Sequence, residues 1–299
     1  MRKILKWIGI VLGALVVLIV LVLAGLYTAT TLRLSKRYSY PPSAVTVPTD
    51  AASLARGEHL VKSFLACTGC HGDQLQGQEF FNLPPLVVVY TPNLTRGQGG
   101  AAATFSDADF VRVLRHGVDP TGRALFVMPS ENFTNLSDQD LGAVIAYVKS
   151  FPPIDHTSPP PQFLPLGRIM MAAGPFNIRF PVEEIDHTGA RLAISPAAGT
   201  PDFGPYLVSI AGCRSCHGSN LAGGQSGDPS SPPAPNLTPA GELGSWSQQD
   251  FVNTLRTGTT PSGHQLSDQM PWMYFRNGTD EELAAIYAYL KTVPAVASK

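Results

Sequence analysis

The sequence predicts a mainly α-helical protein in which an N-terminal transmembrane helix precedes two tandem copies of one unit. Three observations support this prediction. An uncharged apolar run opens the 299-residue chain, a set of motifs recurs at a nearly constant offset, and several segments have the apolar spacing and capping residues of helices. The 28 glycines and 27 prolines predict that many loops connect these short helices.

The N-terminal apolar run extends from Trp7 to Tyr27, which is 21 residues without a charge. As a helix it would be about 31 Å long, close to the roughly 30 Å of a membrane's hydrocarbon core. A cleaved signal peptide has a shorter apolar core of about 7–15 residues and a small-residue cleavage site. We therefore predict a retained anchor at residues 1–28 and an extended tether at residues 29–49, with a cleaved signal as the alternative.

Charge is divided unevenly along the chain. Residues 1–49 hold six Lys/Arg and no acidic residue, whereas residues 50–299 hold 15 Lys/Arg and 22 Asp/Glu. No basic cluster follows residue 37, so nucleic-acid binding has no electrostatic support. Basic residues flank the apolar run almost equally on both sides, so the positive-inside rule alone does not orient it.

Two stretches of the chain carry the same motifs in the same order. Residues 50–153 and residues 201–299 each contain Cys-x-x-Cys-His, Pro-Asn-Leu-Thr, a Phe-Val pair followed by Leu-Arg, and Met-Pro. The offset between the copies is 146 at the first cysteine, 143 at the asparagine, 141 at the phenylalanine and 142 from the methionine onward. Chance matches would not keep this register, so the pattern indicates an internal duplication into two domains.

Each copy has the sequence signals of short capped helices. Three segments carry an N-terminal capping pattern before apolar residues at helical spacing. They are Ser106-x-x-Asp109, Ser137-x-x-Asp140 and Thr279-x-x-Glu282. The first of these helices is expected to end near Gly117. A further helix is expected at residues 51–66, and neither copy shows the sustained alternation of a β-strand.

Residues 154–200 separate the two predicted domains. They contain an apolar stretch from Phe163 to Met171. A structureless loop of this length inside a compact protein would be unusual. We therefore predict a linker that packs over one or both domains, with a partner-binding surface as the alternative.

All four cysteines of the chain fall in two Cys-x-x-Cys-His motifs. The motif residues are Cys67, Cys70 and His71 in the first copy, and Cys213, Cys216 and His217 in the second. Cysteines three residues apart on a helical turn face the same side, so each can form a thioether to one vinyl group of a haem. The histidine that follows is then placed beneath the iron, and the motif is typical of c-type haem attachment. A shared structural zinc, disulfides or redox thiols are the alternatives, but none of them requires the histidines.

A methionine before proline recurs downstream of each motif, at Met128 and Met270. Haem iron held by His and Met is the arrangement of electron-transfer sites, since the soft thioether favours Fe(II) and raises the potential. We therefore predict that His71 and His217 are the proximal ligands and that these methionines are the distal ones. Core methionines, or Met273 in place of Met270, are the alternatives.

Two further polar residues recur, an asparagine at Asn93 and Asn236 and an arginine at Arg115 and Arg256. We interpret the asparagines as turn residues and the arginines as solvated helix charges, with contact to a haem propionate as the alternative for both. The remaining histidines have no repeat partner and are interpreted as surface or core residues. They are His59, His116, His156, His187 and His264.

These motifs resemble tandem class I cytochrome c domains, and the chain is similar to the dihaem cytochromes c that serve bacterial membrane dehydrogenases and respiratory chains. The resemblance implies a helical fold wrapped around one covalent haem c in each domain. It also implies single-electron relay by Fe(III)/Fe(II) cycling, as a free carrier or a complex subunit, with a membrane oxidoreductase or another redox protein as partner.

The resemblance also orients the chain. Bacterial haem c is attached outside the cytoplasmic membrane, so both domains are expected on the periplasmic or outer face of a single-pass protein. A dihaem peroxidase or a catalytic haem subunit with one open iron site is the alternative function. Two symmetric methionine candidates argue against it, because six-coordinate irons leave no vacant position.

Overall fold

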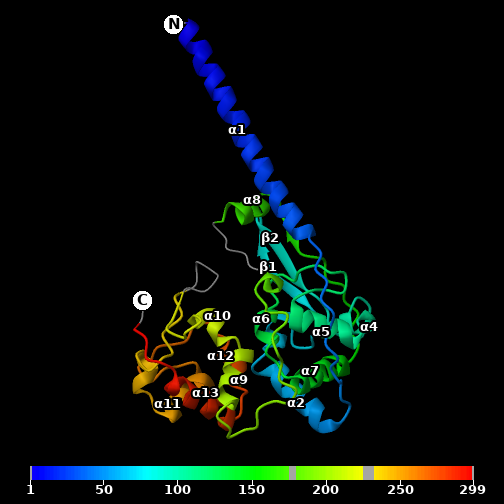
Figure 1. The fold of residues 1–299 in the computed structure, drawn as a ribbon, viewed down its shortest axis with the longest axis vertical. Helices are drawn as coiled ribbons and strands as arrows, with labels where there is room; N and C mark the ends of the chain where they lie inside the picture. The colour runs from blue at the N-terminus through cyan, green and yellow to red at the C-terminus, as the bar shows by residue number, and fades with distance from the viewer. Residues whose placement is uncertain (1, 175–179, 225–231, 298–299) are drawn as a thin grey trace.

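A long N-terminal helix projects from a mainly helical body in the computed structural model, which describes residues 2–174, 180–224 and 232–297 (Figure 1). This helix, α1 (Arg2–Ser35), carries exposed apolar side chains from Ile4 to Leu23. Within the described ranges it is the one helix long and apolar enough to cross a membrane. It continues past the predicted anchor into residues 29–35 of the predicted tether.

The two sequence copies fold into two sets of equivalent helices. In the first copy these are α2 (Ala51–Lys62), α3 (Cys67–His71), α4 (Ala101–Thr104), α5 (Asp107–His116), α6 (Ser130–Phe133) and α7 (Asp138–Ser150). In the second they are α9 (Phe203–Ile210), α10 (Cys213–His217), η2 (Glu242–Ser245), α11 (Gln248–Thr257), α12 (Trp272–Phe275) and α13 (Asp280–Thr292). Each element has its counterpart in the same order, so the duplication extends to the fold.

The predicted capping patterns form as expected. The Ser106 side chain accepts a hydrogen bond from the Asp109 N–H at the start of α5, and Thr279 does the same with Glu282 at the start of α13. Helix α5 ends at Gly117, whose φ of 64° is in the left-handed region that glycine adopts without strain. These local signals fix where the helices begin and end.

The expectation of copies without strands is wrong for the first copy. Strand β1 (Gln78–Leu83) pairs antiparallel with β2 (Val87–Thr91), which in turn pairs with the short β3 (Gln162–Phe163). Three consecutive valines at residues 87–89 favour extended backbone, and Pro85 and Pro92 bound them. The hairpin is therefore a local feature of one copy, inserted between the shared motifs.

The linker packs over the first domain and over α1, in agreement with the prediction. It contributes β3, helix α8 (Pro165–Ala173) and the 3₁₀ turn η1 (Pro181–Glu183). Its residues Met171, Phe180 and Val182 form a small buried cluster with Val118 of the first domain. Helix α8 lies beside the end of α1 (Figure 1).

The two domains meet around one buried core that includes residues of both copies. Helix α2 packs closely on α7, because Gly57 lies where a Cβ would clash with the Ala143 carbonyl. Gly204 of α9 has the same relation to Ala285 of α13. The two helix pairs thus repeat one packing arrangement within a shared core.

Contacts across the domain boundary follow a pseudo-two-fold pattern. His59 of α2 donates to Glu282 of α13 at 2.7 Å, and Tyr206 of α9 donates to Asp140 of α7 at 2.7 Å. His59 and Tyr206 each lie two residues after a packing glycine, at Gly57 and Gly204, and each carboxylate is the third residue of its helix. Because each copy contributes the same positions to the other, the interface is isologous.

Candidate haem sites

The backbone around each Cys-x-x-Cys-His motif is the same in both copies. Helices α3 and α10 each begin after a residue with positive φ, Ala66 at 47° and Gly212 at 69°. Each ends at a glycine with a φ of 80°, Gly72 and Gly218. The two cysteines and the histidine therefore lie on one short helical turn in each copy, as the spacing predicted.

Each motif histidine is held by a carbonyl of the recurring Pro-Asn-Leu-Thr segment. Nδ1 of His71 donates to the Pro92 carbonyl at 2.9 Å, and Nδ1 of His217 donates to the Pro235 carbonyl at 2.8 Å. Because a carbonyl can only accept, the proton lies on Nδ1 and the lone pair on Nε2. The two residues are 6% and 5% exposed, and burial lowers the pKa of both side chains. Both histidines are thus oriented neutral imidazoles, as metal ligation requires.

The motif cysteines form no disulfide bonds, and burial favours the protonated form of their thiols. All four cysteines are free, and burial raises the pKa of Cys67 and of Cys213 to about 12. Thiolates, not thiols, bind zinc and exchange disulfides. Among the residues that the structure describes, no three His, Cys, Asp or Glu side chains are placed together to hold a metal ion. Within the described ranges, the two motifs are therefore not brought together as one shared zinc site or joined by disulfides.

The recurring methionines occupy equivalent places. Met128 and Met270 each precede the proline that caps a short helix, α6 or α12. Both are partly buried and pack against the shared core, as do Cys67 and Cys213. Met273 instead lies within α12 and is absent from the described side chains that pack on this core. Met270, and not Met273, therefore occupies the position equivalent to Met128.

The recurring asparagines have a structural explanation. The Asn93 side chain donates to the Ile154 carbonyl at 2.7 Å, and that of Asn236 donates to the Val296 carbonyl at 2.7 Å. Both carbonyls lie beyond the closing helix of their copy, α7 or α13. Each asparagine also accepts from the N–H two residues later, at Thr95 and Thr238, as in an Asx turn. These contacts confirm the turn interpretation. Each asparagine also holds the segment that follows the closing helix of its domain against this turn.

The recurring arginines join two helices of their own domain. Arg115 at the end of α5 is only 2% exposed and pairs with Asp138 at the start of α7, at 2.6 Å. Arg256 pairs with Asp280 at the start of α13, at 2.7 Å. The interpretation as a solvated charge is therefore wrong for Arg115, because its side chain is almost fully buried. Asp138 and Asp280 also recur at the offset of 142, and this recurrence is the sequence signal that could have indicated the arginine–aspartate pairs.

Two of the histidines without a repeat partner lie next to each other. Nδ1 of His116 lies 2.9 Å from Nδ1 of His187, and the Tyr40 ring stacks on His187 with its centroid 3.6 Å away. Burial lowers the pKa of His116 to about 4, so this histidine is neutral in the folded chain. The group joins the tether, the first domain and the linker, which is the core role expected of such residues.

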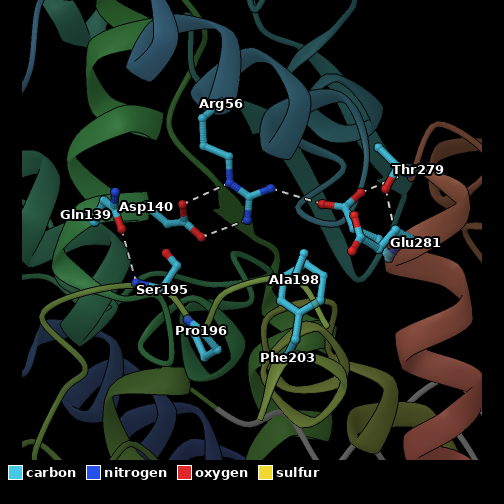
Figure 2. A pocket seen from close by; sticks show the side chains of 10 residues that line it. Arg56, Gln139, Asp140, Ser195, Pro196, Ala198, Phe203, Thr279 and Glu281 are labelled. Carbon is cyan, nitrogen blue, oxygen red and sulfur yellow. Dashed lines mark hydrogen bonds and ion pairs between the residues drawn. The ribbon is translucent and has the colours of Figure 1, made fainter. Parts of the chain in front are cut away.

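The interdomain boundary carries an ion cluster that sequence reasoning missed. Arg56 donates to both oxygens of Asp140, a pair that Figure 2 shows, and to Glu282, each at 3.0 Å. The carboxylates are 2% and 5% exposed. They border a cavity of about 360 Å³ that the linker residue Ser195 also lines. Asp140 and Glu282 recur, but Arg56 has no counterpart, so the duplication pattern did not reveal the pairing.

The boundary also brings each motif helix against the other domain. The Ser215 hydroxyl of α10 donates to the Asn132 side chain of α6 at 3.0 Å. In the equivalent place, Gly69 of α3 lies against the Tyr274 ring of α12, where a Cβ would clash. Each cysteine-bearing helix thus contacts the short helix that follows the other domain's Met-Pro pair.

Two family models match separate parts of the chain. The model described as cytochrome c oxidase, cbb3-type, subunit III covers residues 52–148, and the model described as cytochrome c covers residues 204–294. Each match contains one Cys-x-x-Cys-His motif and one Met-Pro pair.

Several relatives align with most of the chain. It is 30% identical over 286 residues to the fructose dehydrogenase cytochrome subunit of Gluconobacter japonicus, which covers 84% of this chain and 56% of the relative. It is 26% identical to the cytochrome c subunit of the quinone alcohol dehydrogenase of Gluconacetobacter polyoxogenes, covering 85% of this chain and 58% of the relative. The chain thus spans little more than half the length of these two proteins.

A relative of more similar length is named as a diheme cytochrome c-type protein, from Cereibacter sphaeroides. Identity is 29% over 228 residues, which are 69% of this chain and 71% of the relative. Its name and the two family matches agree with the duplicated motifs and helices described above. The chain therefore carries two cytochrome c domains in tandem.

Proposed function

We propose that the chain is a membrane-anchored electron-transfer protein that holds one covalent haem c in each of two domains, residues 50–153 and 201–299. Cys67, Cys70, Cys213 and Cys216 would form the thioethers, His71 and His217 the proximal ligands, and Met128 and Met270 the distal ligands. Bound haem c supplies one-electron exchange between Fe(III) and Fe(II).

The observation that carries this proposal is the hydrogen bond from each motif histidine to a proline carbonyl. It occurs in both copies, at His71 and at His217, and it presents the Nε2 lone pair of a buried, neutral ring. A histidine that only packed in the core would not require the Nδ1-protonated tautomer, and here the same tautomer occurs at the equivalent position of both copies. The protonated thiols beside it and the equivalent methionines supply the remaining groups that a haem c site uses.

The interface between the domains suits a relay between two sites. Ser215 and Asn132 join the two domains directly, as do Gly69 and Tyr274. The spacing of the two motif helices is therefore set by packed side chains and by the Arg56 ion cluster, not by the linker alone. Such fixed contacts would keep the two sites at one distance during electron transfer.

We further propose that the chain is the cytochrome subunit of a membrane dehydrogenase complex, with both domains on the periplasmic face. The support is the names of the relatives, which include cytochrome subunits of fructose, alcohol and gluconate dehydrogenases. The anchor would keep the domains near the enzyme and raise their effective concentration. The acidic balance of residues 50–299 favours a partner with a basic docking surface.

Gentle purification tests this proposal. A tagged full-length chain is extracted from its native membranes in mild detergent and oxidised with ferricyanide. We expect a large dehydrogenase subunit to copurify, and one of fructose, ethanol or gluconate to produce the absorption bands of reduced haem. Sucrose serves as a control that should cause no change. A coloured chain that purifies alone and responds to no donor substrate would contradict the assignment as a subunit.

A further inference from the structure

We propose that the first domain rests on the lipid surface through an apolar patch beside α1, formed by the tip of the β1–β2 hairpin and by helix α8. We call this the membrane-side patch, and its exposed members are Phe81, Leu83 and Leu166. The inference rests on the proposed membrane anchoring and adds a second contact with the bilayer.

Helix α8 is attached to α1 where the membrane span ends. The Thr30 hydroxyl of α1 donates to the Arg168 carbonyl of α8 at 2.6 Å, and the Arg168 guanidinium lies over the Tyr27 ring at 5.3 Å. Tyr27 is the last residue of the apolar run, and the first charged residue after it is Arg33. Figure 1 shows α8 beside α1 at the base of its projecting part.

The position of α8 along α1 corresponds to the lipid headgroup layer. At about 1.5 Å per residue, Thr30 lies roughly 4–5 Å beyond Tyr27 along the helix axis. A bilayer of about 40–45 Å with a hydrocarbon core of about 30 Å leaves roughly 5–8 Å of headgroup layer on each side. A helix fixed at Thr30 is therefore within this layer once α1 spans the membrane.

The outer surface of α8 is apolar. Leu166 is 44% exposed, Ala172 and Ala173 are exposed, and Ile169 and Met170 are half-buried. Arg168 is the only charged residue of the helix, and its side chain turns inward to the Phe163 carbonyl and the Thr31 hydroxyl, both at 2.9 Å. Interfacial helices place such an apolar face about 5–10 Å into the boundary between headgroups and acyl chains.

The hairpin tip continues the same surface. The Leu164 N–H donates to the Leu86 carbonyl at 3.0 Å, and Gly167 of α8 lies directly against that carbonyl. The tip carries Leu83, which is 54% exposed, beside Phe81 at 37%. Backbone contacts therefore join α8 and the tip into one surface.

Exposed apolar residues are concentrated on this side. Outside α1, five large apolar side chains are exposed in the part of the chain that the structure describes, and three of them form the membrane-side patch. The other two are Leu192 and Ile194, near the start of α7, where the Asp138 N–H donates to the Leu192 carbonyl. Helix α7 lies at the other end of the body from α8 (Figure 1), so Ile194 provides a matched control.

Spin-label depth measurements in liposomes test this inference. The full-length haem-loaded chain receives one added thiol as Leu166→Cys, Leu83→Cys or the control Ile194→Cys, and is labelled with a nitroxide. Wild-type protein treated identically reports any label on the native cysteines. The protein is reconstituted in phosphatidylcholine/phosphatidylglycerol vesicles, and accessibility to oxygen is compared with accessibility to a water-soluble nickel chelate.

We expect the oxygen-to-nickel accessibility ratio to be several-fold higher at positions 166 and 83 than at position 194. Equal, water-like ratios at all three positions in protein that floats with the vesicles would overturn the patch while leaving the anchor intact. Protein that fails to float with vesicles would overturn both the anchor and the patch.

Discussion

Replacing Arg56 by methionine is expected to lower the free energy of unfolding by about 3–5 kcal/mol, the cost of leaving a buried charge without its partner. Arg56 holds two carboxylates that are almost fully buried, Asp140 and Glu282, one from each domain. Methionine keeps the aliphatic part of the side chain but removes the charge. The change should appear in thermal or guanidinium unfolding followed by far-UV circular dichroism.

The control for this variant is Lys62→Met on the same helix. Lys62 pairs with Glu58 one turn away, and both side chains are close to half exposed. Such a pair contributes about 0.3–0.5 kcal/mol. If the two variants lose the same small amount of stability, the interdomain ion cluster does not hold the domains together.

Acid sensitivity should separate the wild type from Arg56→Met. Burial would raise the pKa of Glu282, but hydrogen bonds from His59, the Thr279 N–H and Arg56 lower it to about 2 from its ordinary 4.5. A carboxylate whose pKa is depressed in the folded state stabilises the fold above its unfolded pKa and loses this contribution as pH falls. Wild-type stability should therefore decline between about pH 4.5 and 2, and more steeply than that of Arg56→Met.

Replacing Met128 by alanine is expected to convert one of the two haems to a high-spin form and to lower its midpoint potential. The thioether favours Fe(II), so its loss should lower the potential by on the order of 0.1 V or more, within the roughly 0.8 V range that axial ligands set. Met270→Ala should produce the same change in the other domain. Optical redox titration and low-temperature electron paramagnetic resonance would measure both effects.

Met273→Ala is the matched control for the second domain, because this side chain lies three residues from Met270 but outside the shared core. It should leave both potentials unchanged. Carbon monoxide should bind the reduced Met128→Ala and Met270→Ala proteins, yet leave the reduced wild type unaltered. A wild-type haem that binds carbon monoxide would instead favour a catalytic site with an open iron position.

Local sequence signals predicted the parts of the fold that depend on neighbouring residues. The capping residue Ser106 begins a helix and Gly117 ends it because both act through hydrogen bonds and backbone angles within a few positions. The Cys-x-x-Cys-His spacing likewise placed three groups on one turn. The constant offset between copies predicted the equivalent helices.

Long-range contacts between unlike residues could not be predicted. Arg56 and Asp140 are 84 positions apart, and His59 in one copy corresponds to Tyr206 in the other, so no repeated pattern links them. The hairpin was missed because β2 is nearly continuous in valine, without the alternation of a strand that has one solvent-exposed face. The proline carbonyl that holds His71 is a backbone group, which residue identity does not reveal.

The central claim is tested most directly by the mass of the purified, denatured full-length chain. The account predicts the polypeptide plus two haem groups, with one haem on the peptide containing Cys67–His71 and one on the peptide containing Cys213–His217. The same sample should show the sharp absorption bands of a reduced c-type cytochrome after dithionite. A colourless chain of unmodified mass, or one that carries zinc between its thiols, would contradict it.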